Sequence, residues 1–163
     1  MTNFLQNNNK KLIKGFFGYA NVFNHIDADN DVVLQGAFDF GNDPPLPLLW
    51  QHDYKQPIGK VVASHCDEVG LLVKGDIFLD LQQAREAEIL ISNAVTNYLS
   101  IGFEVIDCYY KDNIRFISVL KLHEVSVVTF PANRKTTLHI IDEYTDLQLA
   151  VAKAKCTLTA NGG

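Results

Sequence analysis

The sequence predicts a mainly β domain with flanking helices, in which an antiparallel sheet curls into a β-barrel. Three observations predict this class. Strand-like segments rich in aromatic and β-branched residues recur along the chain, separated by short polar turns. Only two segments carry the residue spacing of an amphipathic helix. The 163 residues are 47% hydrophobic, which suits a single domain with one core and leaves no room for a second domain.

Charge and cysteine content exclude several classes of function. The net charge is -5 and most lysines are scattered, whereas binding to nucleic acid phosphates needs clustered Lys and Arg. Cys66, Cys108 and Cys156 form no C-x-x-C spacing, so we expect free thiols in a reducing compartment and no structural zinc. No apolar run approaches the roughly 20 residues of a membrane span. We therefore expect an intracellular, soluble protein without a metal or cofactor.

The first third of the chain contains one strong strand pattern. We expect a single domain over residues 15–156, an extended or disordered lead-in over 1–14 and a flexible tail over 157–163. Phe and Tyr residues predict a strand over 12–23. Residues 27–31 resemble a calcium loop, but Val32 and Phe38 stand where an EF-hand needs Gly and Glu, so a turn is predicted. Apolar character resumes over 32–38, and proline-rich residues 41–47 predict a loop.

The middle of the chain predicts a β-hairpin followed by a helix. Strands are expected at 59–64 and 70–79, joined by the polar turn 65–68. Asp80 then has the features of a helix N-cap, with Gln83 at the capping-box position. Small and apolar residues recur at helical spacing after it, which predicts a helix over 81–97.

A second antiparallel hairpin follows this helix. Strands are predicted at 101–110 and 115–130 around the turn 111–113, and Pro131 ends the second strand. A short strand is expected at 138–141. The segment 142–155 has a helical pattern whose apolar face packs either on its own domain or on a second copy of the chain. The apolar positions of that face are Tyr144, Leu147, Leu149, Val151 and Ala154.

A single hydroxyl in an apolar run marks a candidate nucleophile. Ser100 begins the strand that follows the predicted helix, and Gly102 stands two residues later, where a missing side chain lets a substrate backbone come close. A serine in a strand is more often a solvent-facing or backbone-bonded hydroxyl. Segments 48–53 and 122–128, however, supply the imidazole and the carboxylate that activate a nucleophilic serine.

His52 and Glu124 are the candidate base and its orienting carboxylate. His52 stands at the edge of an apolar segment. Strand alternation places Glu124 on an apolar face, where a carboxylate needs a hydrogen-bond partner such as a histidine N–H. The alternative is a Glu paired with Lys or Arg. Ser126 is an alternative nucleophile that lacks a following glycine, and His123 falls on the opposite strand face and is the weaker candidate base.

Several segments occur in a distinctive order and spacing that covers about residues 15–137. They are GYANVFNHID, VVLQGAF, PLLWQHDYKQPIGKV, GLLVKGDIFLD, NYLSIGFEV and LHEVSVVTFPAN. In this set the chain resembles the prohead proteases of tailed bacteriophages, serine peptidases of the same broad clan as the herpesvirus assemblins. The resemblance implies an assemblin-like β-barrel in which His52 and Ser100 are catalytic and Glu124 is the third member. Assemblins have a second histidine there, and they use an arginine-bearing loop at the oxyanion, for which Arg134 is the candidate.

The resemblance also implies a biological role. A capsid-maturation serine endopeptidase would cleave scaffold, or the scaffold-like segment of the major capsid protein, and itself. It would act as a homodimer inside the assembling prohead in the host cytoplasm, with no nucleic acid or membrane partner. Two alternatives belong to other classes. One is a non-catalytic capsid- or scaffold-binding module of the same fold, and the other is a small-ester hydrolase, although the G-x-S-x-G elbow of that class is absent.

Overall fold

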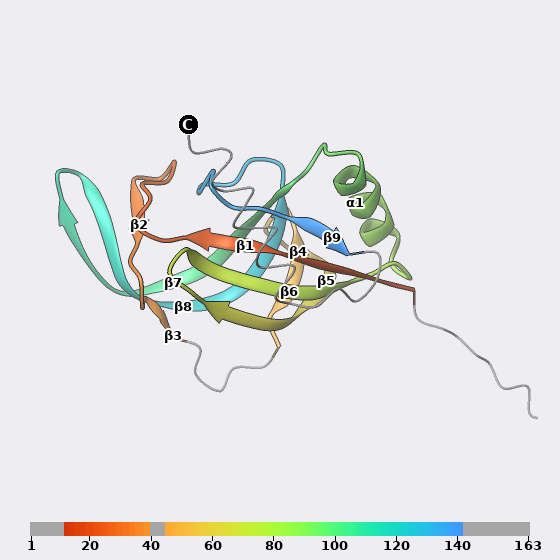
Figure 1. Ribbon diagram of the computed structural model, residues 1–163, viewed down its shortest axis with the longest axis horizontal. Coiled ribbons are helices and arrows are strands. Elements are labelled where there is room, and N and C mark those ends of the chain that lie inside the picture. Colours follow the sequence, from red (N-terminus) through yellow and green to blue (C-terminus); the bar gives the residue numbers. More distant parts are fainter. Residues whose placement is uncertain (1–11, 40–44, 142–163) are drawn as a thin grey trace, which may run out of the picture.

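The computed structural model describes residues 12–39 and 45–141, which form one mixed β-sheet and one helix (Figure 1). Within these residues the strand order is β2-β8-β4-β5-β6-β1-β9, and β3 and β7 also pair with β8. The elements in chain order are β1 (Ile13–Val22), β2 (Asp31–Val33), β3 (Phe38–Asp39), β4 (Pro47–Trp50), β5 (Asp53–Cys66), β6 (Gly70–Phe78), α1 (Gln82–Ser92), β7 (Tyr98–Lys111), β8 (Ile114–Val128) and β9 (His139–Ile141).

The predicted mainly β fold is confirmed, but the sheet differs from the expected antiparallel barrel in two respects. The short strands β2, β3 and β4 all run parallel to β8. They pair with β8 in chain order. β2 lies beside residues 115–117, β3 beside 120–121 and β4 beside 125–127. In the described part of the chain, the sheet also runs from β2 to β9 without closing. It still curls back on itself, since β1 and β7 contact each other without pairing.

The long hairpin of β7 and β8 is the centre of this architecture. Its register runs from Tyr98 opposite Val128 to Lys111 opposite Ile114. The connection is a two-residue turn in which Asp112 and Asn113 have φ of 51° and 63°, the left-handed conformation that Asp and Asn tolerate in such turns. Figure 1 shows the turn end of this hairpin projecting beyond the rest of the domain. At the opposite end of the hairpin Leu99, Val127 and Val128 are buried, so this end lies in the body of the domain.

The core fills the inside of the curled sheet. Phe16, Leu48, Ile58, Leu99 and Val125 come from five different strands and belong to one buried cluster. Burial of each such side chain contributes about 1.5–3 kcal/mol. A second, smaller buried cluster joins β1, β6 and β9 and consists of Phe17, Tyr19, Leu72 and Ile141.

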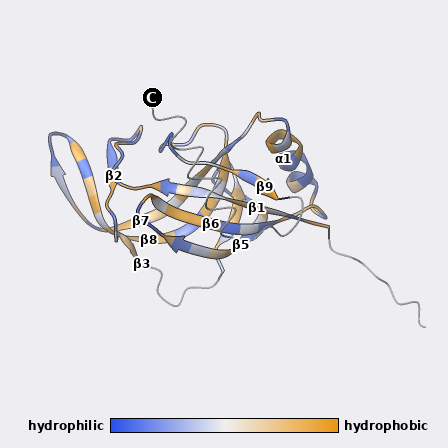
Figure 2. Cartoon of the chain, in the orientation of Figure 1, coloured by the Kyte–Doolittle hydropathy of each residue, from blue (hydrophilic) through white to orange (hydrophobic). Residues whose placement is uncertain are grey.

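Helix α1 is shorter than predicted. It covers the core with Ala84, Ala87 and Ile91, and much of its remaining surface is hydrophilic (Figure 2). The predicted Asp80 cap is wrong, because the N-cap residue is Leu81 and it makes no side-chain cap hydrogen bond. The helix ends at Ser92 because Ala94 adopts a left-handed conformation with φ of 58°.

Two predictions fall partly or wholly outside the described residues. Cys66 and Cys108 are free thiols, whereas Cys156 lies beyond Ile141. The predicted helix over 142–155, like the flexible tail over 157–163, also lies in the part that is not described. The described helix is neither long enough nor apolar enough to cross a membrane.

Candidate active site

His52 lies in a two-residue turn between β4 and β5. Trp50 pairs with Asp53, so Gln51 and His52 form the whole connection. Their φ angles are 53° and 60°. Two consecutive positive φ angles are typical of type I′ hairpin turns, which usually contain Asn or Gly. For other residues the left-handed conformation costs roughly 1–2 kcal/mol each. Neighbouring groups must therefore hold this turn in place.

Strand β8 and the segment after it supply those groups. The Gln51 backbone N–H donates to Val127 O at 2.9 Å, and the His52 backbone N–H donates to Ser126 Oγ at 3.2 Å. The Gln51 side chain is bonded to Thr129 in both directions, with Nε2 donating to Oγ1 at 2.8 Å and Oε1 accepting from the Thr129 N–H at 3.2 Å. The imidazole of His52 is thus carried by a turn fastened to β8.

Glu124 provides the partner of this imidazole. The side chain is buried, with 1% of its surface exposed, and Oε1 lies 2.7 Å from His52 Nδ1. Its second oxygen, Oε2, accepts a hydrogen bond from Ser126 Oγ at 2.6 Å. Both oxygens therefore have partners, as a buried carboxylate requires. The partner predicted for a carboxylate on this apolar face, a histidine N–H, is the one found, and not a Lys or Arg.

The register of the hairpin explains Gly102. Gly102 lies opposite Glu124, and Ser100 lies opposite Ser126. A Cβ added to Gly102 would overlap Glu124 Oε1 and lie 2.9 Å from Cδ. The space left by the missing side chain therefore belongs to the Glu124 carboxylate. This corrects the sequence-based interpretation that Gly102 leaves room for a substrate backbone.

Ser100 and His52 line the same cleft, whose volume is about 870 Å³. Ser100 is 8% exposed, and it belongs to the β7 end that lies in the body of the domain. Ser126, the alternative nucleophile, is fully buried and its hydroxyl donates to Glu124. Ser126 therefore has neither the access nor the free hydroxyl that attack on a polypeptide requires.

Comparison with known proteins identifies the family. A family model described as "Caudovirus prohead serine protease" matches residues 3–149. The chain belongs to this family. It is 31% identical over 131 residues to the prohead protease of Enterobacteria phage HK97, covering 74% of this chain and 56% of that protein. It is 32% identical over 133 residues to the prohead protease of Escherichia phage T5, covering 76% and 60%.

Other relatives extend this picture. A capsid polyprotein of Pseudomonas phage PAJU2 is 30% identical over 107 residues, and the match covers 58% of this chain and 15% of the polyprotein. The chain spans between 56% and 60% of the length of the two prohead proteases that it matches. The matches do not favour the alternative of a non-catalytic assembly module.

Solved structures show the same fold in herpesvirus proteases. The KSHV protease in complex with a hexapeptide phosphonate inhibitor has a TM-score of 0.55 and 13% identity, covering 90% of this chain and 75% of that chain. The varicella-zoster virus protease has a TM-score of 0.51 and 11% identity, covering 93% and 78%. At this level of identity the likeness concerns the fold alone, and it confirms the assemblin-like fold of this prohead protease family member.

The rim of the cleft in this prohead protease family member combines exposed apolar side chains with a cationic one. Val95 and Phe130 are exposed apolar residues on the rim, with 58% and 91% of their surfaces accessible. Arg134, the residue suggested for the oxyanion, is also exposed and lines the cleft, so it lies on the same side of the domain as Ser100. It also lines an adjoining cavity of about 480 Å³.

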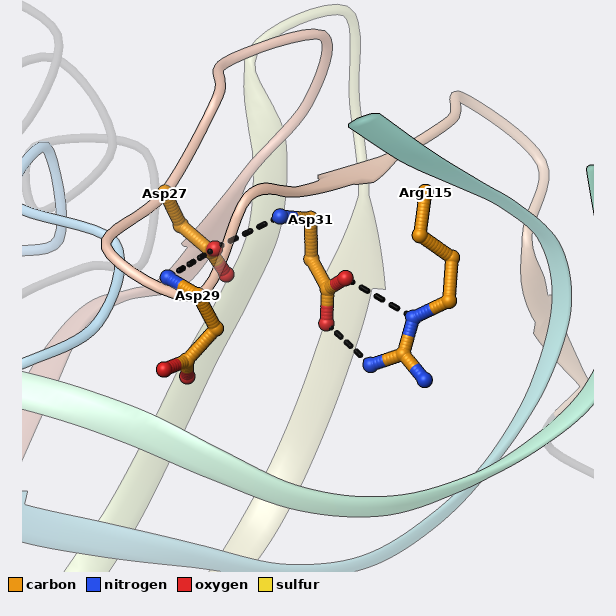
Figure 3. A network of polar contacts seen from close by, with 4 residues as sticks. All are labelled: Asp27, Asp29, Asp31 and Arg115. Carbon is orange, nitrogen blue, oxygen red and sulfur yellow. Dashed lines mark hydrogen bonds and ion pairs between the residues drawn. The ribbon is translucent and has the colours of Figure 1, made fainter. Parts of the chain in front are cut away.

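One wall of the cleft contains an acidic turn that sequence reasoning interpreted only as a turn (Figure 3). Asp27 Oδ1 accepts the backbone N–H groups of Asp29 and Asp31, each at 2.9 Å. Burial raises the pKa of Asp27, and these two hydrogen bonds oppose that shift. Asp31 binds Arg115 through two hydrogen bonds, one from Nε at 2.8 Å, and this pairing raises the pKa of Arg115. Asp27 therefore closes the turn through hydrogen bonds to the turn's own backbone, and Asp31 joins the turn to Arg115 on β8.

Proposed function

We propose that this chain is a serine endopeptidase of phage capsid maturation, with Ser100 as nucleophile, His52 as general base and Glu124 as the carboxylate that orients His52. One observation carries the proposal. In a member of the prohead serine protease family, a buried carboxylate lies 2.7 Å from an imidazole nitrogen, and that imidazole shares a cleft with a serine. A carboxylate that orients a histidine beside a serine is the arrangement that serine hydrolysis needs.

The contact between His52 and Glu124 supports a different role for each ring nitrogen of His52. In this proposal His52 Nδ1–H donates a hydrogen bond to Glu124 Oε1, which leaves the lone pair of Nε2 available to Ser100. In the first step Nε2 takes the Ser100 proton while Oγ forms a bond to the carbonyl carbon of the substrate. The imidazolium, stabilised by the carboxylate, then gives that proton to the leaving amine. Water, activated by the same nitrogen, hydrolyses the acyl-enzyme and restores Ser100.

The sheet also provides a mode of substrate binding. Among the described residues β7 pairs with β8 alone, so no strand pairs with its other edge next to Ser100. An extended polypeptide can add to such an edge as a further strand. In this proposal the substrates are scaffold, the scaffold-like segment of the major capsid protein and the protease itself, inside the assembling prohead. The names of the relatives, prohead protease and capsid polyprotein, support this choice.

Arg134 completes the proposed site. A guanidinium beside the cleft is suited to stabilise the negative charge that develops on the carbonyl oxygen. Arg134 lines the cleft and is exposed, so it can approach a bound peptide. Gly102, by contrast, acts in this proposal through the space that it gives to Glu124.

Cleavage of a peptide from the cognate capsid protein tests the proposal. Ser100→Ala and His52→Ala should each remove activity, because a nucleophile and its base act as a unit whose loss costs on the order of a millionfold in rate. Glu124→Gln should retain more activity, since it keeps the shape and loses only the charge. Ser92→Ala on α1, whose exposed hydroxyl donates to Glu88, is the matched control and should behave as wild type.

A serine-directed fluorophosphonate probe gives an independent readout. It should label the wild-type protein at Ser100 and leave Ser100→Ala unlabelled. Cleavage of the capsid peptide by Ser100→Ala would rule out the assigned nucleophile. Rapid turnover of small esters without peptide cleavage would instead favour the small-ester hydrolase.

A further inference from the structure

Ser126 occupies an unusual position between the two other groups of the proposed site. It is fully buried on β8. Its hydroxyl donates to Glu124 Oε2 at 2.6 Å and accepts the backbone N–H of His52 at 3.2 Å. One oxygen atom is therefore bonded both to the carboxylate and to the turn that carries the imidazole.

Each of these bonds restrains a different movement. A glutamate side chain can rotate about its bonds, and a single hydrogen bond from His52 would leave that rotation possible. The Ser126 bond fixes the second oxygen, while Gly102 leaves room for this rotamer on the side of β7. The bond to the His52 N–H stabilises a residue whose φ of 60° is unfavourable without such support.

We propose that Ser126 is a positioning residue that joins Glu124 to the His52 turn, so that the carboxylate and the imidazole keep one relative arrangement. This inference rests on the proposed function of the site. The hydroxyl supplies a donor to one partner and an acceptor to the other, a combination that Ala, Val or Cys cannot reproduce at full strength. Since Ser126 also lies opposite Ser100 in the hairpin, it is placed where the three segments of the site meet.

The turn offers a second anchor against which Ser126 can be compared. The side chain of Gln51 is fastened to Thr129 by two exposed hydrogen bonds that do not involve Glu124. Gln51→Ala therefore loosens the turn and leaves the carboxylate untouched. Ser126→Ala loosens the turn and also removes the donor to the carboxylate. If both hydrogen bonds of Ser126 matter, Ser126→Ala lowers kcat more than Gln51→Ala does and also changes the pH dependence.

The experiment compares wild type, Ser126→Ala, Ser126→Cys and Gln51→Ala for kcat and KM on the capsid peptide across the pH range of activity. Misplacement of a catalytic group by about 1 Å can cost on the order of 100-fold in rate. We expect Ser126→Ala to lower kcat by about 10- to 100-fold with KM nearly unchanged, and Gln51→Ala to lower it less. Ser126→Cys, which keeps a weak donor in a similar volume, should fall between wild type and Ser126→Ala.

The pH profile separates positioning from a general loss of structure. Without the Ser126 donor, the negative charge of Glu124 is less dispersed and attracts the imidazole proton more strongly. The acid limb of kcat/KM, which reports protonation of the base, should therefore move to higher pH in Ser126→Ala and stay in place in Gln51→Ala.

A measurement that does not depend on catalysis distinguishes the role of Ser126 from the proposed function of the site. The hydrogen-bonded Nδ1 proton of His52 should give a low-field proton resonance in wild type that is lost or broadened in folded Ser126→Ala. An unchanged resonance together with wild-type kcat would overturn the role of Ser126, and Ser126→Cys decides by the same readouts if Ser126→Ala does not fold. Failure of the wild-type protein to cleave any capsid peptide, with the resonance still dependent on Ser126, would count against the proposed function alone.

Discussion

Gly102→Ala tests how tightly the Glu124 carboxylate is confined. The substitution adds one methyl group that would overlap Oε1 and lie 2.9 Å from both Cδ and Cγ of Glu124. The φ angle of Gly102 is not in the left-handed region, so Ala is compatible with the backbone and the effect comes from this contact. Glu124 has 1% of its side chain exposed, and both of its carboxylate oxygens are hydrogen-bonded, to His52 and to Ser126.

The size of the effect follows from the bonds that must change. Moving the carboxylate away from the new methyl group disturbs the 2.7 Å contact with His52 and the 2.6 Å contact with Ser126. A hydrogen bond to a charged group is worth about 1.5–3 kcal/mol. We expect the free energy of unfolding to fall by about 2–4 kcal/mol, and kcat on the capsid peptide to fall by at least about 100-fold.

Urea unfolding and peptide cleavage measure the two effects, with Gly15→Ala as the matched control. Gly15 is also a strand glycine, but a Cβ there would meet Ile141 at an ordinary distance of 3.5 Å. Gly102→Ala should cost much less stability in a Glu124→Ala background, because the clash is then absent, and the double-mutant cycle should show strong coupling. Wild-type stability and kcat in Gly102→Ala would refute the argument that this glycine exists to house the carboxylate.

Three further predictions concern other parts of the molecule. Arg115→Ala should lower the free energy of unfolding in urea by about 2–3 kcal/mol, because Asp31, only 5% exposed, would become a buried unpaired carboxylate; a loss below about 0.5 kcal/mol would contradict this. Burial and the neighbouring Asp67 raise the pKa of the Cys66 thiol to about 11, so about one molecule in 1,000 carries the thiolate at pH 8. Alkylation by iodoacetamide, followed by mass spectrometry, should therefore be slow at pH 8 and accelerate toward pH 11, and a pH-independent rate would be inconsistent with it. If activity depends on dimerisation, specific activity should rise with protein concentration, whereas a constant value where sedimentation shows only monomer would exclude this coupling.

Local patterns in the sequence predicted most of the fold. The hairpin of β7 and β8 follows from two apolar runs around a polar turn, and β6 follows from a run that begins at Gly70. The parallel pairing of β4 with β8 joins Leu48 to Val125, and nothing near either residue indicates the other. The end of α1 was misjudged because apolar spacing continues past Ser92, while the left-handed conformation of Ala94 is decided by the packing that follows.

In the candidate site, too, local patterns predicted some features, whereas contacts between distant segments decided the others. Residue types and strand alternation indicated Ser100, His52 and Glu124, because an apolar strand face makes a carboxylate conspicuous. The strained turn at His52 was not predictable, since Gln51 and His52 are not the residues that such turns prefer. The role of Ser126 depends on contacts between β8 and the β4–β5 turn, which only the folded register reveals.

The dependence of every part of the site on β8 has a consequence for the timing of activity during synthesis. Glu124 belongs to β8, the His52 turn is bonded to it, and the strand of Ser100 pairs along its length. A ribosome has already made His52 and Ser100 before it reaches this strand, yet the two cannot be aligned until the later segment has emerged and paired. Contacts between residues so distant in sequence form slowly, because the intervening loop must first close. The proposed site therefore cannot assemble until β8 has been translated and has paired with its neighbours, which makes its formation a late event of folding.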